Sequence, residues 1–409
     1  VCQGTAKALL ENMARQLVDT KQRAFTWTGP YGGGKSSLAL MLCSLVGPNA
    51  KLREKARQIL ALPADSAVAK VFASRGDGWM VLPVVGRRAS VISDLRQALA
   101  RAKGGEEAGK RKASDVIADL VETAETHKQG VLIVIDELGK FLEASAHGGD
   151  DVYFFQELAE AASRTSGKLI VVGILHQPFD AYAARLGRQA QDDWAKVQGR
   201  FVDIPLVAAT DEVIELIGRA IQVDDEAIRN SASAFVDIIA TAIRTRRPGA
   251  PARLAEGLLR CWPVHPVTAA LLGPISKRRF GQNERSTFGF LASREPLGFL
   301  EFLDGQPNRW ESMYGPAQYW DYLRANLEPA ILASPDSHRW AVACDAVDRA
   351  EAGGSPVHVD VVKAVALIEM FRNGTGLVPE ESVLAVSIQG ADPQQTHAAL
   401  QELVRRKIL

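Results

Sequence analysis

Residues 24–46 read AFTWTGPYGGGKSSLALMLCSLV, in which a glycine-rich loop joins two apolar segments. Residues 25–27 are typical of a buried strand, and residues 37–46 are typical of an apolar helix. The loop between them fits the pattern GxxxxGK[ST] over residues 29–36. Glycine places no side chain in the way of a phosphate, so backbone N–H groups can surround its oxygens, and the helix N-terminus adds partial positive charge. The segment therefore predicts a phosphate-binding loop.

Two residues of this loop have particular predicted roles toward ATP. The Lys35 ammonium would reach the β- and γ-phosphates, and the Ser36 hydroxyl would bind Mg²⁺. The alternative is a glycine-rich turn that merely precedes Lys-Ser, and the flanking strand and helix make it the weaker explanation. The predicted nucleotide-binding residues are Gly29, Pro30, Tyr31, Gly32, Gly33, Gly34, Lys35, Ser36 and Ser37.

A second motif, VLIVIDE, occupies residues 131–137, about 100 residues after the loop. Asp136 ends a buried strand and would hold Mg²⁺ through water, while Glu137 would polarise the attacking water as general base. An acidic pair can also simply mark the end of a strand. Together with the phosphate-binding loop it indicates catalysis, and the adjacent glutamate favours hydrolysis over phosphoryl transfer to a small substrate.

Short apolar runs alternate with helical stretches in the first half of the chain. Continuous apolar strands of this kind indicate a parallel sheet covered by helices on both faces, and hence an α/β fold. After about residue 207 the strand signals stop and helical patterns follow. The five predicted strands are Ala24–Thr28, Met80–Val85, Val131–Ile135, Leu169–Leu175 and Phe201–Leu206.

Polar residues lie at the ends of the last two predicted strands. His176 and Gln177 follow the fourth strand, where one of them can touch the γ-phosphate and the attacking water if the two motif strands lie side by side. A polar residue where a strand meets solvent explains them equally well. Arg200 precedes the fifth strand, where it can enter a neighbouring subunit's nucleotide site in a ring or filament and neutralise charge on the γ-phosphate. The alternative is a surface arginine paired with a nearby carboxylate.

The composition excludes several classes of protein. The chain has 409 residues, of which 47% are apolar and 23% charged, so it is globular, and its 48 basic and 48 acidic residues exclude binding to nucleic acid or a membrane through overall charge. No apolar run approaches the roughly 18 residues that span a bilayer. Because the chain begins with valine, we expect a fragment of a longer protein.

Four widely spaced cysteines exclude a disulfide framework and a cysteine zinc site, and they favour the cytoplasm. They are Cys2, Cys43, Cys261 and Cys344.

Basic residues are concentrated between residues 244 and 285, where nine of them accompany two acids, Glu256 and Glu284, for a local charge of +7. Such a basic patch can contact the phosphate backbone of DNA. It can equally serve a bound nucleotide or an acidic neighbouring subunit, and a solvated helix face is the commoner explanation. The nine are Arg244, Arg246, Arg247, Arg253, Arg260, Lys277, Arg278, Arg279 and Arg285.

The order of these motifs resembles that of the AAA+ ATPases, in particular the branch of origin-recognition and helicase-loading proteins, and of the neighbouring STAND signalling ATPases. The resemblance covers roughly residues 1–290. It favours Gln177 slightly over His176, because the family usually has a neutral polar residue there. Residues 262–266 (WPVHP) and 280–286 (FGQNERS) look like the lid of large phage-defence ATPases such as those of BREX systems. That similarity implies that Arg285 senses the γ-phosphate.

The resemblance implies an ATPase core at 1–206, an α-helical lid at 207–294, an aromatic-rich helical region at 295–355 and a truncated winged-helix-like module of three helices at 356–409. A three-helix packing module without DNA contact explains the last part equally well. The implied activity is hydrolysis of Mg²⁺–ATP by an oligomer within a larger machine with partner proteins, and the similarity to phage-defence ATPases implies a role in antiviral defence. The alternative is a STAND-like switch, in which ATP binding triggers oligomerisation and turnover is slow.

Overall fold

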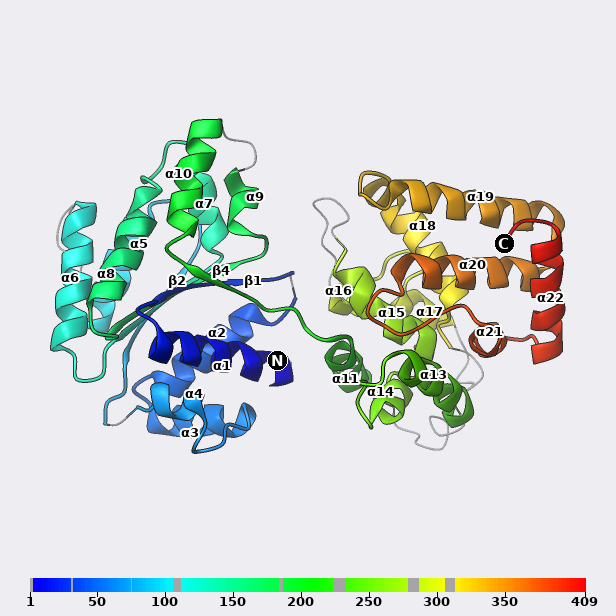
Figure 1. Ribbon diagram of the computed structural model, residues 1–409, viewed down its shortest axis with the longest axis horizontal. Helices are drawn as coiled ribbons and strands as arrows, with labels where there is room; N and C mark the ends of the chain where they lie inside the picture. The colour runs from blue at the N-terminus through cyan, green and yellow to red at the C-terminus, as the bar shows by residue number, and fades with distance from the viewer. Residues whose placement is uncertain are drawn as a thin grey trace. The chain divides into compact units, whose positions relative to one another are not determined.

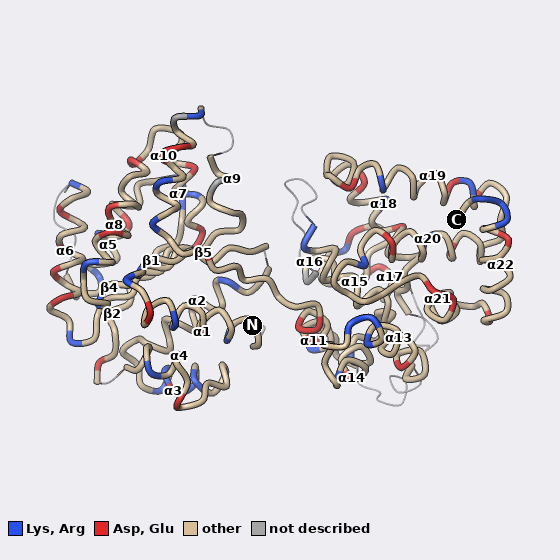
Figure 2. Tube along the Cα trace, in the orientation of Figure 1, with Lys and Arg blue, Asp and Glu red and all other residues tan. Residues whose placement is uncertain are grey.

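The computed structural model describes residues 3–30, 32–74, 76–105, 112–183, 187–223, 232–278, 287–305 and 313–409. The chain divides into two compact units, Val1–Val207 and Ala208–Leu409 (Figure 1). The first unit contains the sheet, and the second is helical. Basic and acidic residues are interspersed along both units (Figure 2), in keeping with the net charge of zero.

The sheet of the first unit has five parallel strands in the order β2-β3-β4-β1-β5. The predicted α/β fold, a phosphate-loop sheet flanked by helices, is confirmed. The two motif strands are not side by side, because β4 lies between β1 and β3. Strands that follow one another in the chain need not pair, because a helical crossover can carry the chain past a strand. The strands are β1 (Ala24–Thr28), β2 (Met80–Val85), β3 (Val131–Asp136), β4 (Leu169–Leu175) and β5 (Val202–Pro205).

Helices cover both faces of this sheet (Figure 1). Side chains alternate between the faces along a strand. On β3, Leu132 and Val134 therefore join the hydrophobic core on one face, while Val131, Ile133 and Ile135 join the core on the other. The first face is covered by α1 (Gln3–Asp19), α2 (Lys35–Val46), α3 (Ala50–Ile59) and α4 (Ala67–Val71), and the second by α5 (Val91–Ala102), α6 (Ala113–Thr126), α7 (Leu138–Ala146), α8 (Tyr153–Arg164), α9 (Phe179–Ala183) and α10 (Arg188–Gln198).

The second unit has no strand among its described residues, only an isolated bridge between Val264 and Tyr314. One hydrophobic core joins residues as far apart as Ile239, Trp320 and Leu367, and the Trp320 and Trp340 rings stack at 4.5 Å. Its helices are α11 (Thr210–Ala220), α13 (Ser233–Arg246), α14 (Leu254–Arg260), α15 (Pro266–Ser276), α16 (Thr287–Ala292), α17 (Phe299–Gly305), α18 (Pro316–Leu332), α19 (Ser337–Gly353), α20 (Pro356–Phe371), α21 (Glu381–Ser387) and α22 (Pro393–Arg405). No described helix of either unit is long and apolar enough to cross a membrane.

A fully buried histidine, His265, caps α15 in this core. Its Nδ1 atom accepts a hydrogen bond from the Val267 N–H (3.2 Å), and its Nε2–H donates to the Val386 carbonyl (2.8 Å). Both contacts suit a neutral ring. Desolvation lowers the pKa of His265 from 6.5 to about 4, because burial disfavours the charged form.

We expect His265 to make the second unit sensitive to acid. Below pH 6.5 the unfolded chain binds a proton that the folded chain excludes, so stability falls with pH until about pH 4, by about 3 kcal/mol in all. Urea unfolding between pH 7 and pH 4 measures this loss. His265→Asn keeps a capping oxygen but no titrating ring, so its stability should fall less over the same range. Equal losses in the two proteins would contradict the assignment.

Candidate functional site

A cavity of about 250 Å³ lies at the carboxyl edge of the sheet, where β1, β3 and β4 end. Because β4 lies between the two motif strands, the residue after it faces both the phosphate-binding loop and the acidic pair. The cavity thus brings together most of the site residues predicted from the sequence. It is lined by Gly32, Gly33, Gly34, Lys35, Ser36, Ser37, Asp136, Glu137, Ile174, Leu175 and His176.

The loop conformation depends on its glycines. Gly32 and Gly34 have φ angles of 72° and 85°, in the left-handed region that side chains disfavour. Gly29 packs so closely on the Leu206 carbonyl that a Cβ there would overlap it. The Gly33 N–H donates to the Pro30 carbonyl (3.2 Å), which closes the turn before α2 begins at Lys35. Tyr31, also predicted to bind nucleotide, lies outside the described residues.

The Lys35 side chain is buried, with 8% of its surface exposed. Its Nζ atom donates to the carbonyls of Gly29 (2.5 Å) and Pro30 (2.7 Å), so the ammonium lies against the loop itself. A buried ammonium needs such oxygen partners. Phosphate oxygens are stronger acceptors for a cation than neutral carbonyls, so this lysine can exchange its partners when a phosphate enters.

The residues predicted to bind Mg²⁺ offer a suitable set of donors. Ser36 is exposed at the start of α2, and Asp136 lines the same cavity from the end of β3. One carboxylate oxygen of Asp136, Oδ1, accepts the Glu137 N–H (2.9 Å), which orients the carboxylate. A hydroxyl and a carboxylate oxygen are ligands that Mg²⁺ prefers, together with water and phosphate. The arrangement therefore fits the ion.

Glu137 has a strained backbone, with a φ of 51° in a residue that has a side chain. Two contacts hold it. Its carboxylate forms an ion pair with Lys140 one turn along α7, and its carbonyl lies so close to Gly86 that a Cβ there would overlap it. The Gly86 N–H also donates to the Asp136 carbonyl (2.7 Å). Strain at such a position is typical of functional sites, where the surrounding structure enforces it.

His176 lines the cavity, and Gln177 is not among the lining residues. The Tyr182 hydroxyl lies 2.9 Å from His176 Nδ1, and the two rings meet edge to face. Tyr182 reaches this place because it packs on Gly139, where a Cβ would overlap the ring. Of the two, His176 is therefore the one that lines the cavity.

Arg200 lies at the opposite edge of the sheet from the phosphate-binding loop. It precedes β5, which runs parallel to β1, and the loop follows β1. Five residues of strand put the two about 15 Å apart. The Arg200 Nε atom forms an ion pair with Glu160 (3.2 Å), so within its own chain Arg200 is a surface arginine paired with a carboxylate. Any role at a nucleotide bound to the loop must therefore be in a second subunit. Arg285 lies outside the described residues.

Several arginines of the basic patch have partners from outside residues 244–285. Arg246 pairs with Glu380 (2.7 Å), Arg278 with Asp336 (3.3 Å), and Arg247 with Asp211. Counting these three acids lowers the local charge from +7 to +4. The count along the sequence missed them because they are distant in the chain.

Sequence reasoning did not identify three residues that hold the site. Lys140 had a local signal, since it follows Glu137 by three residues at the start of a helix. Gly86 and Tyr182 had none, because their contacts depend on how β2 pairs with β3 and how α9 packs against α7.

Comparison with known proteins finds similarity among solved structures alone. No family model and no curated protein matches the chain. Among solved structures, Cdc6p from Pyrobaculum aerophilum is similar with a TM-score of 0.36 and 11% identity, over 98% of this chain and 94% of that one. The ORC1 protein from Aeropyrum pernix, in a complex with DNA, is similar with a TM-score of 0.32 and 14% identity, over 97% and 82% of the two chains. At these values neither structure carries an argument about function.

Proposed function

We propose that the chain binds Mg²⁺–ATP and hydrolyses it to ADP and phosphate. One observation carries this proposal: a single cavity is lined by the glycine-rich loop, Lys35, the Asp136–Glu137 pair and His176. The loop and the lysine recognise phosphates, and the acidic pair supplies a metal-binding carboxylate next to a general base.

The chemistry follows from these positions. Loop N–H groups and Lys35 hold the β- and γ-phosphates, and Ser36 and Asp136 hold Mg²⁺, which when bound neutralises charge on those phosphates. Glu137 takes a proton from a water molecule as the water oxygen bonds to the γ-phosphorus. The bond between that phosphorus and the β–γ bridging oxygen breaks, and ADP leaves with the electron pair. His176, held by Tyr182, can donate a hydrogen bond to the γ-phosphate.

Steady release of phosphate from ATP by the purified protein tests this proposal. Turnover should require Mg²⁺ and stop when EDTA removes it, because Ser36 and Asp136 can neutralise no phosphate charge without the ion. Slow turnover by protein that keeps its nucleotide through purification would favour the STAND-like switch. No binding of ATP with or without Mg²⁺ would contradict both.

We further propose that the protein oligomerises and that Arg200 then completes the nucleotide site of a second subunit. Its position supports this, since it is half exposed at the edge of the sheet opposite its own loop.

Contact with DNA through residues 244–285 stays a prediction, as does a place in a phage-defence machine. The salt dependence of DNA affinity tests the contact with DNA, because each phosphate contact adds about 0.9 to the slope of the logarithm of affinity against the logarithm of salt concentration. Absence of DNA binding at low salt would contradict it.

A further inference from the structure

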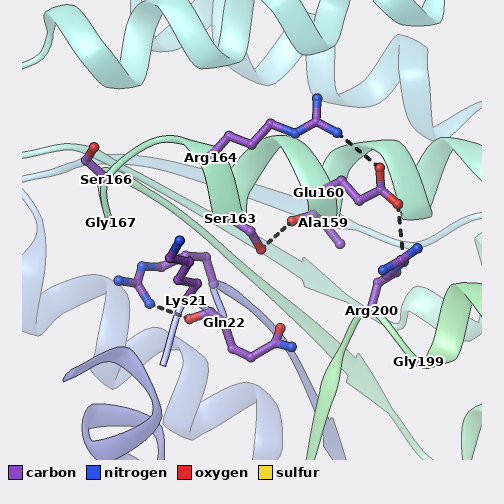
Figure 3. A pocket seen from close by; sticks show the side chains of 11 residues that line it. Lys21, Gln22, Ala159, Glu160, Ser163, Arg164, Ser166, Gly167, Gly199 and Arg200 are labelled. Atoms are coloured by element: carbon purple, nitrogen blue, oxygen red, sulfur yellow. Dashed lines mark hydrogen bonds and ion pairs between the residues drawn. The ribbon is translucent and has the colours of Figure 1, made fainter. Parts of the chain in front are cut away.

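A second and larger cavity, of about 590 Å³, lies in the first unit at the amino ends of β1, β4 and β5. It is therefore at the sheet edge opposite the phosphate-binding loop. Four basic side chains line it, accompanied by one acidic side chain (Figure 3). They are Lys21, Arg23, Arg164, Arg200 and Glu160.

Glu160 does not neutralise this cluster. Its carboxylate lies between Arg164 (3.2 Å) and Arg200 (3.2 Å), as Figure 3 shows, so one negative charge serves two guanidinium groups. Lys21 has neither a hydrogen-bond nor an ion-pair partner within the described part of the chain. Four cations and one carboxylate leave a formal charge of +3.

Helix dipoles do not account for the excess. Three helices, α1, α8 and α10, end within two residues of cavity-lining residues, and each C-terminus carries about half a negative charge. Together they offset about 1.5 of the three positive charges, so a net positive charge remains. The negative ends of the three helices therefore balance only part of the positive charge of the four basic residues.

The geometry of Arg23 leaves one side of its guanidinium toward the cavity. Its Nη1 atom donates to the carbonyls of Thr20 (2.9 Å) and Gln22 (2.7 Å). Gly167 lies beside the other two nitrogens, where a Cβ would come within 3.3 Å of Nε and 3.4 Å of Nη2, and among the described residues neither nitrogen has a hydrogen-bond partner. Partial burial lowers the pKa of Arg23, since desolvation disfavours its charge, and a nearby anion would counter that effect.

The lining also indicates what kind of anion fits. The cavity has the volume of a small-molecule site and exceeds the space that one phosphate fills. Guanidinium groups bind phosphate oxygens in pairs, and the exposed hydroxyl of Ser166 adds a further donor, whereas the Ser163 hydroxyl donates to the Ala159 carbonyl (3.0 Å). No aromatic side chain of the described residues lines it, so these residues offer no stacking surface for a nucleobase.

We propose that this cavity binds a ligand with two or more linked phosphates and recognises the phosphates alone. Linked phosphates of this kind occur both in free polyphosphate and in the triphosphate tail of a nucleotide. The proposal does not rest on ATP hydrolysis at the other edge of the sheet.

Calorimetric titration of sodium tripolyphosphate into the Lys35→Ala protein tests this, because that variant weakens phosphate binding at the loop. We expect saturable binding of one tripolyphosphate, at least tenfold tighter than orthophosphate. The double variant Lys21→Ala/Arg164→Ala should lose at least tenfold in affinity. Both side chains are exposed at the rim of the cavity, Arg164 to 77%, so the fold should survive.

The matched control is the double variant Lys51→Ala/Arg219→Ala. Lys51 is exposed, as Lys21 is, and Arg219 pairs with a glutamate four residues earlier in its helix, as Arg164 does. Its affinity should stay within twofold. ATP should bind no more tightly than tripolyphosphate, because nothing in the cavity receives the base. The proposal would be overturned if tripolyphosphate showed no saturable binding, or if the control variant lost as much affinity as Lys21→Ala/Arg164→Ala. It would also be overturned if ATP bound tenfold more tightly than tripolyphosphate and this tighter binding depended on Lys21 and Arg164.

Discussion

Replacing Glu137 by glutamine is expected to lower the rate of ATP hydrolysis by about 10²–10⁴ while ATP affinity stays within a few fold. The amide keeps the size and shape of the carboxylate but cannot accept the proton of the attacking water. Binding should survive because the loop and Lys35, which contact the phosphates, are unchanged. Phosphate release and nucleotide titration on the same preparation measure the two quantities.

A glutamate on the same helix provides the control. Glu143 also belongs to α7 and pairs with Arg88 (3.5 Å), but it does not line the nucleotide cavity. Glu143→Gln should therefore keep turnover within twofold. If Glu137→Gln hydrolyses ATP at the original rate, Glu137 is not the base. If it loses ATP binding as well, its role is in holding the nucleotide.

Replacing Arg200 by alanine should lower turnover by about 10³–10⁵ without loss of ATP affinity, because an arginine that stabilises the transition state from a neighbouring subunit has an effect of this size. The ion pair with Glu160 is half exposed and contributes little to stability, so the variant should fold. Arg57→Ala is the matched control, since Arg57 forms a similar surface pair with Glu54 (4.0 Å) on α3.

Mixing experiments separate action within one chain from action between chains. Arg200→Ala keeps an intact loop, and Lys35→Ala keeps an intact arginine, so each alone should be nearly inactive. Mixed, they should regain activity, and the recovery should grow with protein concentration because the site forms on assembly. No recovery at any ratio, in subunits shown to exchange, would leave Arg200 as a surface residue and favour the switch.

The local features of the first unit could be predicted from the sequence. Buried parallel strands are continuous apolar runs, and β1, β2 and β4 have the predicted bounds while β3 gains only Asp136. The glycine-rich turn between β1 and α2 was equally predictable, since its glycines, lysine and serine stand at a fixed spacing between an apolar strand and an apolar helix.

Contacts between distant segments could not be predicted in this way. The position of β4 between the motif strands decides that His176 lines the cavity, and no local pattern reports strand order. The ion pair of Arg246 with Glu380 joins residues 134 positions apart, so a charge count over residues 244–285 overestimates the patch. The partner of Arg200, Glu160, comes from a helix that is likewise distant in the chain.

The central claim is that the loop binds the phosphates of ATP, and titration of Mg²⁺–ATP into the original protein and Lys35→Ala tests it most directly. Lys51→Ala, which removes an exposed lysine of the same unit, is the control, and thermal unfolding shows whether each variant is folded. We predict saturable binding by the original protein and by Lys51→Ala, and a loss of at least a hundredfold in folded Lys35→Ala, because no other lysine or arginine among the described residues lines the cavity. Equal affinity in all three proteins would contradict it.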